Sequence, residues 1–531
     1  QSYLPEKVGP SAIPAPAVVK GPVRALETHE IKELVSCFGD SARRCWDAGF
    51  DFIEIHGAHG YLVTQFLALN SNIRTDEYGG SFENRCRFLF EIIQDIREKA
   101  GEDFPVGIRI NGNDYIENGW ELKDTVRIAP LLEKAGVAYL HVSGGVYGST
   151  ELTIPSMYAP QGCFVHLAEE VKKHVNIPVI AVGRIKYPEH VEEILQTGKA
   201  DIVALGRSFL ADPDYPIKAE KGELIRPCIG CCLGCIHAVL AKEPGSCVVN
   251  PEVGREYKLK EEPKADKPQS ILVVGAGPSG LAAARQFALK GHKVLIVEKE
   301  KDSGGLLALA AKAPGRSELS DILKFFTESL QNLNVDIKYD TALSPELIED
   351  IQADHVIMAT GSLPEFPVIK GLSGTKMNLI TAVELISGKE SVGKKVIVLG
   401  GGMTGLITAD FLADQGKEVV VLNRKKSYAE EMSSNDRYYL RERLKKGKVL
   451  LYKKLAIQKF TDDGLVFTTD GEEKILTGFD AVVISEKYTS IRSSREIENK
   501  TRAQFHWIGD AKSPRHLMYC ISEAEEIAES I

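Results

Sequence analysis

The segment SILVVGAGPSGLAAARQFALKGHKVLIVEKE, Ser270–Glu300, predicts a strand, a glycine-rich turn, a helix and a second strand that ends in an acid. Its turn carries the pattern G-x-G-x-x-G, formed by Gly275, Gly277 and Gly280. In this pattern the first glycine allows a tight turn, the second lets a pyrophosphate approach the backbone, and the third lets the helix pack on the strand. The phosphates then meet the positive end of the helix. Glu298 ends the second strand, where a carboxylate can accept from ribose hydroxyls, so the segment predicts a dinucleotide-binding domain.

A second segment of the same kind follows, KKVIVLGGGMTGLITADFLADQGKEVVVLNRKK at Lys394–Lys426. Its turn glycines are Gly400, Gly402 and Gly405. Its second strand ends in Asn423 and Arg424 instead of an acid. A missing carboxylate with nearby cations favours a nucleotide 2′-phosphate, hence NADPH with Arg424 as a contact. A solvated basic strand end in an NADH enzyme is the alternative.

Two short segments bracket this second unit. They are HVIMATGS at His355–Ser362 and HWIGDAKSP at His506–Pro514, both typical of flavoproteins that bind two dinucleotides. The bracketing predicts an FAD domain split in sequence, with an NAD(P)H domain inserted in it. Asp510, after Gly509, is predicted to hold the ribityl or pyrophosphate region of FAD, and Gly305 is a further predicted cofactor contact.

Clustered cysteines lie upstream, in RPCIGCCLGCIHAVLAKEPGSCVVNP at Arg226–Pro251. The spacing C-x2-C-x3-C-x11-C is formed by Cys228, Cys231, Cys235 and Cys247, and by spacing Cys232 is a bystander. Thiolates suit an iron–sulfur cluster or zinc. Zinc sites usually pair two C-x2-C knuckles, and a metal centre between redox domains favours an electron relay. We therefore expect an iron–sulfur cluster, with structural zinc as the alternative.

Five apolar runs in the first half of the chain alternate with amphipathic helical stretches. The expected strands are Phe50–Ile55, Pro105–Ile110, Ala138–Ser143, Pro178–Gly183 and Asp201–Gly206, and the expected helices include Glu83–Ala100, Lys123–Ala135 and Pro188–Gln196. Such alternation builds a parallel sheet, either open or closed into a barrel. Because a (β/α)8 barrel needs eight units, we expect the given chain to start inside a barrel whose first three strands are absent.

Length and charge exclude several classes of protein. The 531 residues suggest about three domains. The net charge of −9 argues against a nucleic-acid partner, and no run approaches the ~18 apolar residues of a membrane span. The ten cysteines show no disulfide framework, which favours a reducing cytoplasm. The sequence leaves a homo-oligomer open.

The segment IEIHGAHGYLVTQFLALNSNIRTDEYGGSFENRCRF at Ile53–Phe88 closely resembles the Old Yellow Enzyme family. Members of that family carry H-x-x-[NH]-x-Y followed by N-x-R-x-D-x-Y-G-G-S-x-x-N-R. With the cysteines and both nucleotide segments, the whole chain resembles the long branch of the family. That branch includes 2,4-dienoyl-CoA reductase, enoate reductases, bile-acid and steroid ene-reductases, and trimethylamine dehydrogenase. The cysteine spacing is similar to the dienoyl-CoA reductase type.

The resemblance implies FMN in a TIM barrel, one [4Fe–4S] cluster on the four cysteines, FAD, and NAD(P)H as the electron donor. Electrons would pass from NAD(P)H to FAD, to the cluster, to FMN and to the substrate. The expected boundaries are 1–222 for the FMN-binding barrel, 223–256 for the iron–sulfur segment, 257–269 for a linker, 270–385 for the first part of the FAD domain, 386–490 for the NAD(P)H domain and 491–531 for the second part of the FAD domain.

The resemblance also assigns roles to residues at the barrel. His56 and His59 would hydrogen-bond the group that activates an alkene, and Tyr61 would donate a proton to the α carbon, with Tyr147 the next candidate. Arg109 would lie beside N1 and O2 of FMN. The FMN phosphate would be held by Gly183, Arg184, Gly206 and Arg207.

The implied substrate is a small molecule with an activated C=C bond. Amine dehydrogenases of the branch carry a tyrosine where His56 stands, and the dienoyl-CoA reductases lack the histidine pair. An amine dehydrogenase and an electron-transfer subunit that serves a partner protein remain the alternatives.

Overall fold

The computed structural model describes residues 6–14, 21–257, 264–492 and 495–531. Residues 258–263 of the predicted linker lie outside this described part. The chain divides into two compact units, Gln1–Gly206 and Arg207–Ile531, and each is described by itself.

A parallel sheet of five strands organises the first unit. Its strands pair in chain order and are β3 (Ile53–Gly57), β4 (Val106–Asn113), β5 (Tyr139–Gly144), β6 (Val179–Ala181) and β7 (Ile202–Val203). A separate short ribbon pairs β1 (Val8–Gly9) with β2 (Arg24–Ala25). The predicted alternation of strands and helices is therefore confirmed, and the α/β class with it.

Helices fill the connections of this sheet. They are α1 (Thr28–Asp47), α2 (Leu62–Leu67), α3 (Phe82–Ala100), α4 (Leu122–Lys134), η1 (Tyr147–Ser149), α5 (Thr150–Thr153), α6 (Val165–Lys172) and α7 (Pro188–Gln196). Ser81 caps α3 by accepting from the backbone N–H of Asn84. Apolar residues of α3 recur at helical spacing and are buried, so one face of the helix packs on the sheet.

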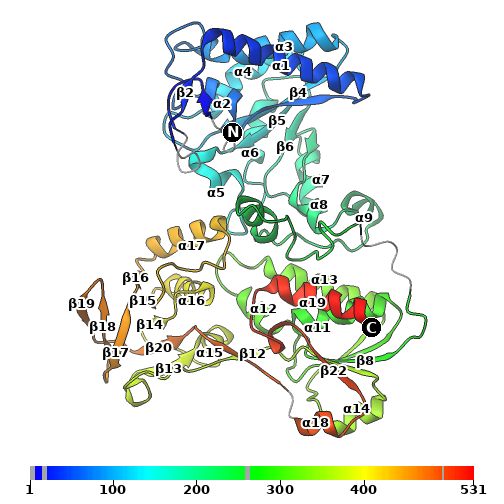
Figure 1. The fold of residues 1–531 in the computed structure, drawn as a ribbon, viewed down its shortest axis with the longest axis vertical. Helices are drawn as coiled ribbons and strands as arrows, with labels where there is room; N and C mark the ends of the chain where they lie inside the picture. The colour runs from blue at the N-terminus through cyan, green and yellow to red at the C-terminus, as the bar shows by residue number, and fades with distance from the viewer. Residues whose placement is uncertain (1–5, 15–20, 258–263, 493–494) are drawn as a thin grey trace. The chain divides into compact units, whose positions relative to one another are not determined.

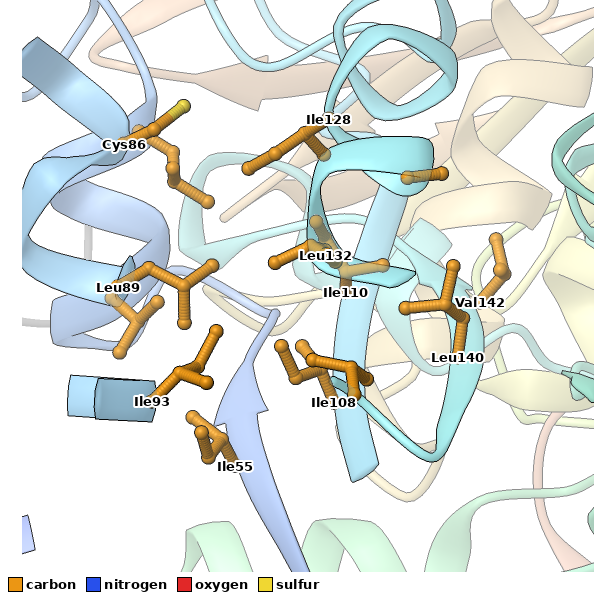
Figure 2. Close-up of a cluster of buried hydrophobic side chains, with 14 of the residues drawn as sticks. Ile55, Cys86, Leu89, Ile93, Ile108, Ile110, Ile128, Leu132, Leu140 and Val142 are labelled. Atoms are coloured by element: carbon orange, nitrogen blue, oxygen red, sulfur yellow. The ribbon is translucent and has the colours of Figure 1, made fainter. Parts of the chain in front are cut away.

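Register decides which strand residues face these helices. Ile55, Ile108 and Leu140 are direct neighbours across β3, β4 and β5, and all three are buried. Figure 2 shows Ile55 near Ile93 of α3, with Leu140 in the same cluster of buried side chains. Because side chains alternate along a strand, the next residues, His56, Arg109 and His141, point to the opposite face of the sheet.

The second unit contains two further parallel sheets (Figure 1). The first has the order β10-β9-β8-β11-β22 and consists of β8 (Ser270–Val274), β9 (Lys293–Val297), β10 (Asp336–Lys338), β11 (His355–Met358) and β22 (Gln504–Trp507). Its helices are α11 (Pro278–Leu289), α12 (Gly305–Ala310), α13 (Leu319–Asn332), α14 (Pro345–Ile351), α18 (Arg495–Asn499) and α19 (Leu517–Ser530), with η4 (Gly509–Ala511). The last strand of the chain thus pairs with β11, far upstream.

The other sheet is built from the intervening residues, in the order β13-β20-β14-β15-β16. Its strands are β13 (Asn378–Thr381), β14 (Lys395–Leu399), β15 (Glu418–Asn423), β16 (Leu450–Lys453) and β20 (Ala481–Ile484), and its helices are α15 (Ala382–Ser387), α16 (Met403–Asp414) and α17 (Ser434–Lys446), with η3 (Leu372–Gly374). Three antiparallel strands between β16 and β20 form a separate sheet: β17 (Ala456–Phe460), β18 (Leu465–Thr469) and β19 (Glu472–Leu476). The two crossings between the sheets pair with each other as β12 (Ser362–Pro364) and β21 (Tyr488–Ser490).

Two short helices, α8 (Arg207–Ala211) and α9 (Tyr215–Lys221), precede the cysteine segment, which itself contains the π-helix η2 (Leu233–His237) and α10 (Ala238–Leu240). Within the described ranges, no helix combines the length and the apolar character needed to cross a membrane.

Candidate functional site

Polar side chains gather at the carboxyl ends of β3, β4 and β5. His56 is the register neighbour of Arg109 on β4. His59 and Tyr61 follow β3 in the turn that leads into α2. The ring centroids lie 5.2 Å apart for His56 and His59, and 4.7 Å apart for His56 and Tyr61. The three predicted catalytic residues therefore come together.

Burial disfavours the charged form of both histidines. His59 has a φ of 59°, and its ring Nε2 lies 2.8 Å from the hydroxyl of Ser143. Burial, followed by the nearby charge of Arg109, lowers the pKa of His59 to about 3. The same two causes lower the pKa of His56. A neutral imidazole can donate one N–H hydrogen bond but carries no positive charge. Any stabilisation of a developing oxyanion by these residues would therefore come from the hydrogen bond itself.

Arg109 fits the predicted flavin contact. Burial lowers the pKa of its guanidinium, which the carboxylate of Glu54 opposes. Its Nη2 reaches the hydroxyl of Ser143 only at 3.5 Å, and its buried Nε has no hydrogen-bond partner among the described residues. A buried guanidinium of this kind needs an acceptor, and the carbonyl and ring nitrogen of a flavin pyrimidine are acceptors of the right kind.

The predicted phosphate residues lie after β6 and β7. Gly183 and Arg184 both have positive φ, and a Cβ at Gly183 would lie 2.7 Å from the ring of Phe164. Gly206 follows β7, and its Cβ position is open. The guanidinium of Arg207 instead donates to Cys232 Sγ at 2.9 Å. The structure thus places the side chain of Arg207 at the cysteines, a position that the sequence did not predict.

The four predicted cysteine ligands surround a cavity of the second unit. Its walls include Cys228, Cys231, Cys232, Cys235, Cys247, Arg207, Leu210, Ile229, Val248 and Val249. In the described part of the chain, no three Cys, His, Asp or Glu side chains converge on a single-ion position. Cysteine thiolates are the ligands that hold iron–sulfur clusters in proteins. Cys232 is buried in the same wall.

The first glycine turn has the predicted geometry. Gly275 has a φ of 107°, and a Cβ at Gly280 would overlap the carbonyl of Gly275. Gly277 begins α11 with open space before it. A carboxylate oxygen of Glu298 accepts from the backbone N–H of Ala276 at 2.7 Å, so the acid lies at the turn. Gly305 also lies close to this turn, because a Cβ added to Gly305 would lie 3.5 Å from the Cα of Gly277.

Asp510 lies in η4, after Gly509, whose φ of 58° favours glycine. One carboxylate oxygen of Asp510 accepts from the hydroxyl of Ser362 at 2.9 Å and the other from the backbone N–H of Arg515 at 3.1 Å. These bonds fix the carboxylate just beyond β22, in the sheet that carries the first glycine turn.

The second glycine turn repeats the first. Gly400 has a φ of 120°, Gly402 begins α16, and a Cβ at Gly405 would overlap the carbonyl of Gly400. Arg424 forms an ion pair with Glu486, which follows β20. The predicted 2′-phosphate contact therefore already has a carboxylate partner.

Sequence reasoning missed several residues of these sites. Ser143 and Asn111 bond His59 at the strand ends, and the signal that could have found them is their position directly after apolar strand residues. His141 Nδ1 pairs with Glu54 at 3.0 Å although β4 lies between their strands, so neighbouring register alone does not predict this pair. Glu486 carries no such signal, because its contact with Arg424 joins two loops.

Comparisons with known proteins agree with this organisation. Residues 2–224 match the NADH:flavin oxidoreductase / NADH oxidase family, and residues 269–486 match the family described as pyridine nucleotide-disulphide oxidoreductase. The NADH oxidase of Thermoanaerobacter brockii is 40% identical over 83% of this chain and 68% of its own length. The cinnamate reductase of Clostridium sporogenes is 36% identical over 99% of this chain and 81% of its own length.

A structure of 2-naphthoyl-CoA reductase in complex with 2-naphthoyl-CoA superposes with a TM-score of 0.94 at 30% identity, covering 99% of this chain and 80% of that one. The resemblance to the long, Old Yellow Enzyme-related branch is confirmed. The chain belongs to the NADH:flavin oxidoreductase / NADH oxidase family.

Proposed function

We propose that this enzyme uses NAD(P)H to reduce the C=C bond of an activated alkene, an α,β-unsaturated carboxylate or carbonyl compound. The observation that carries the proposal is the cluster of His56, His59 and Tyr61 beside a buried, unsatisfied Arg109. The names of two similar proteins, a cinnamate reductase and a 2-naphthoyl-CoA reductase, support an unsaturated substrate.

The residues divide the chemistry between them. Bound FMN would supply a hydride, and bound FAD and a [4Fe–4S] cluster would accept electrons that originate from NAD(P)H. His56 and His59, both neutral, would hydrogen-bond the substrate oxygen, and these bonds strengthen as negative charge develops there. Tyr61 would protonate the α carbon as a general acid. Arg109 would offset negative charge at the pyrimidine edge of the flavin.

The cysteines would hold the cluster. Cys228, Cys231, Cys235 and Cys247 supply the four thiolates that such a cluster requires. Apolar side chains in the cavity wall, such as Ile229 and Val248, would limit the access of solvent to a bound cluster, which is one way in which a protein sets a cluster's potential. Structural zinc, which four thiolates also bind at about 2.3 Å, is the alternative.

The substrate class can be tested by anaerobic oxidation of NADH and NADPH with a panel of acceptors. The acceptors are an aromatic enoate, a cyclic enone and an enoyl thioester. A secondary amine is tested separately as an electron donor. We expect one saturated product per NAD(P)H oxidised with at least one of the three alkenes. Flavin reduction by the amine without NAD(P)H would instead establish an amine dehydrogenase.

Nucleotide preference gives a separate prediction. If Arg424 contacts a 2′-phosphate, Glu486→Gln should free the guanidinium of Arg424 from its ion pair. The ratio of kcat/KM for NADPH to kcat/KM for NADH should then rise by about tenfold, the effect expected of one charge-assisted hydrogen bond. Arg424→Ala should raise the KM for NADPH and leave that for NADH nearly unchanged. Steady-state kinetics of both variants with both nucleotides measure this. An unchanged ratio in both would show that the basic strand end is a solvated surface feature.

A further inference from the structure

The two glycine turns have the same backbone geometry but differ in whether a side chain lies over their second glycine. Gly277 and Gly402 occupy equivalent positions, each directly before the first residue of the helix of its turn. A Cβ on Gly277 would have no atom within 4 Å. A Cβ on Gly402 would lie 2.9 Å from Oε1 of Glu431. A carboxylate therefore covers the second turn where the first is open.

Glu431 also bonds the helix behind that glycine. Its Oε1 accepts from the backbone N–H of Met403, the first residue of α16. The N–H groups of a first helical turn have no partner inside the helix, and with the helix dipole they form an anion position. In a dinucleotide-binding turn this is the position of the pyrophosphate. The carboxylate of Glu431 thus satisfies a donor that the nucleotide would otherwise use.

The loop between β15 and α17 holds Glu431 in this place. The backbone N–H of Ala429 donates to the carbonyl of Gly401, inside the turn, at 2.9 Å. The side chain of Asn423 donates to the carbonyl of Ser427 at 2.7 Å. Glu431 is distinct from the acid that binds ribose in such domains, because the equivalent of Glu298 at the end of β15 is Asn423.

We propose that Glu431 is an internal occupant of the pyrophosphate position, which NAD(P)H displaces when it binds. The inference rests on the proposed use of this domain for NAD(P)H. Displacement lowers the affinity for the nucleotide and links its binding to movement of the loop 424–433. The enzyme exchanges one anion for another at the same N–H groups, so the second turn is not left unsatisfied between turnovers.

Glu431→Gln tests the proposal, with Glu430→Gln as the matched control. Glu430 is the neighbouring residue, is exposed as Glu431 is, and loses the same charge, but among the described residues it makes no hydrogen bond or ion pair with the turn. The ligands are ADP-ribose, which carries the pyrophosphate, and adenosine, which lacks it. Calorimetry on the flavin-loaded protein, whose FAD position is filled, measures both.

We expect Glu431→Gln to tighten ADP-ribose binding about three- to tenfold, because a neutral amide competes less well with a pyrophosphate. Adenosine binding, and both ligands with Glu430→Gln, should change by less than about twofold. Equal effects of the two variants would overturn the proposal, as would weaker ADP-ribose binding in Glu431→Gln. Since no alkene is present, the result does not depend on the substrate class.

Thermal unfolding gives a second readout. Glu431→Gln should lower the Tm of the nucleotide-free protein, because an anionic partner of the helix is lost. At saturating ADP-ribose the Tm difference from wild type should vanish, because the ligand displaces the side chain at position 431 from α16 in both proteins. A Tm difference that persists with ligand would mean that Glu431 remains on α16 in the complex and contradict the proposal.

Discussion

Tyr61→Phe slows alkene turnover by about 10²–10⁴-fold and leaves flavin reduction by NAD(P)H intact, which is the effect of removing a positioned general acid. The ring of Tyr61 lies 4.7 Å from that of His56 and is 42% exposed, so its hydroxyl can reach a substrate held by the histidines. Stopped-flow absorbance separates the two half-reactions, with NADH mixed first and the alkene second. Only the second should slow.

Tyr147→Phe is the matched control. Its ring centroid lies 5.7 Å from that of Tyr61. Burial, and then a hydrogen bond to Tyr61, raise the pKa of Tyr147, which disfavours the loss of its proton. We expect its loss to slow alkene turnover far less than the loss of Tyr61. If the order of the two effects is reversed, Tyr147 is the donor and Tyr61 its support.

Cys231→Ser removes the iron–sulfur cluster and with it the transfer of electrons from NAD(P)H to the alkene. Wild-type protein should contain about four irons and four acid-labile sulfides per chain, with no stoichiometric zinc. The variant should retain its flavins and FAD reduction by NADH, but alkene reduction should fall to background. Metal analysis and the two half-reactions measure this.

Cys232→Ser is the control for that experiment. Cys232 is buried in the same cavity wall but lies outside the spacing of the four ligands. Its replacement should leave the iron content unchanged. One zinc per wild-type chain without sulfide would contradict the relay and leave the cysteines a structural role.

The sequence predicted the parts of this protein that follow from repeated local patterns. The alternation of strands and helices predicted the positions of β3 to β7. Parallel pairing then places His56 and Arg109 side by side toward the carboxyl ends of their strands. The glycine spacing predicted both turns, down to the contact of Gly280 with Gly275. Each of these features depends on residues close in sequence or on the fixed geometry of a parallel sheet.

Contacts between loops could not be predicted in the same way. Glu431 reaches Met403 and Glu486 reaches Arg424 across segments that have no periodic pattern. The side chain of Arg207 is a second case, because one residue at a strand end can turn toward either of two neighbouring segments. Its position against Cys232 depends on how the cysteine segment folds, and no local signal describes that.

The strand β22 belongs to the same sheet as β8, although a whole second sheet separates the two in sequence. This order has a consequence for synthesis of the chain. On the ribosome, β11 emerges with one edge unpaired, and its neighbour β22 follows only after every strand of the inserted sheet has been made. Domains generally fold as units during translation, so the inserted domain completes first. Until then the surrounding domain exposes an open strand edge, the kind that recruits chaperones or a wrong partner. Its maturation is therefore the last folding event of the second unit.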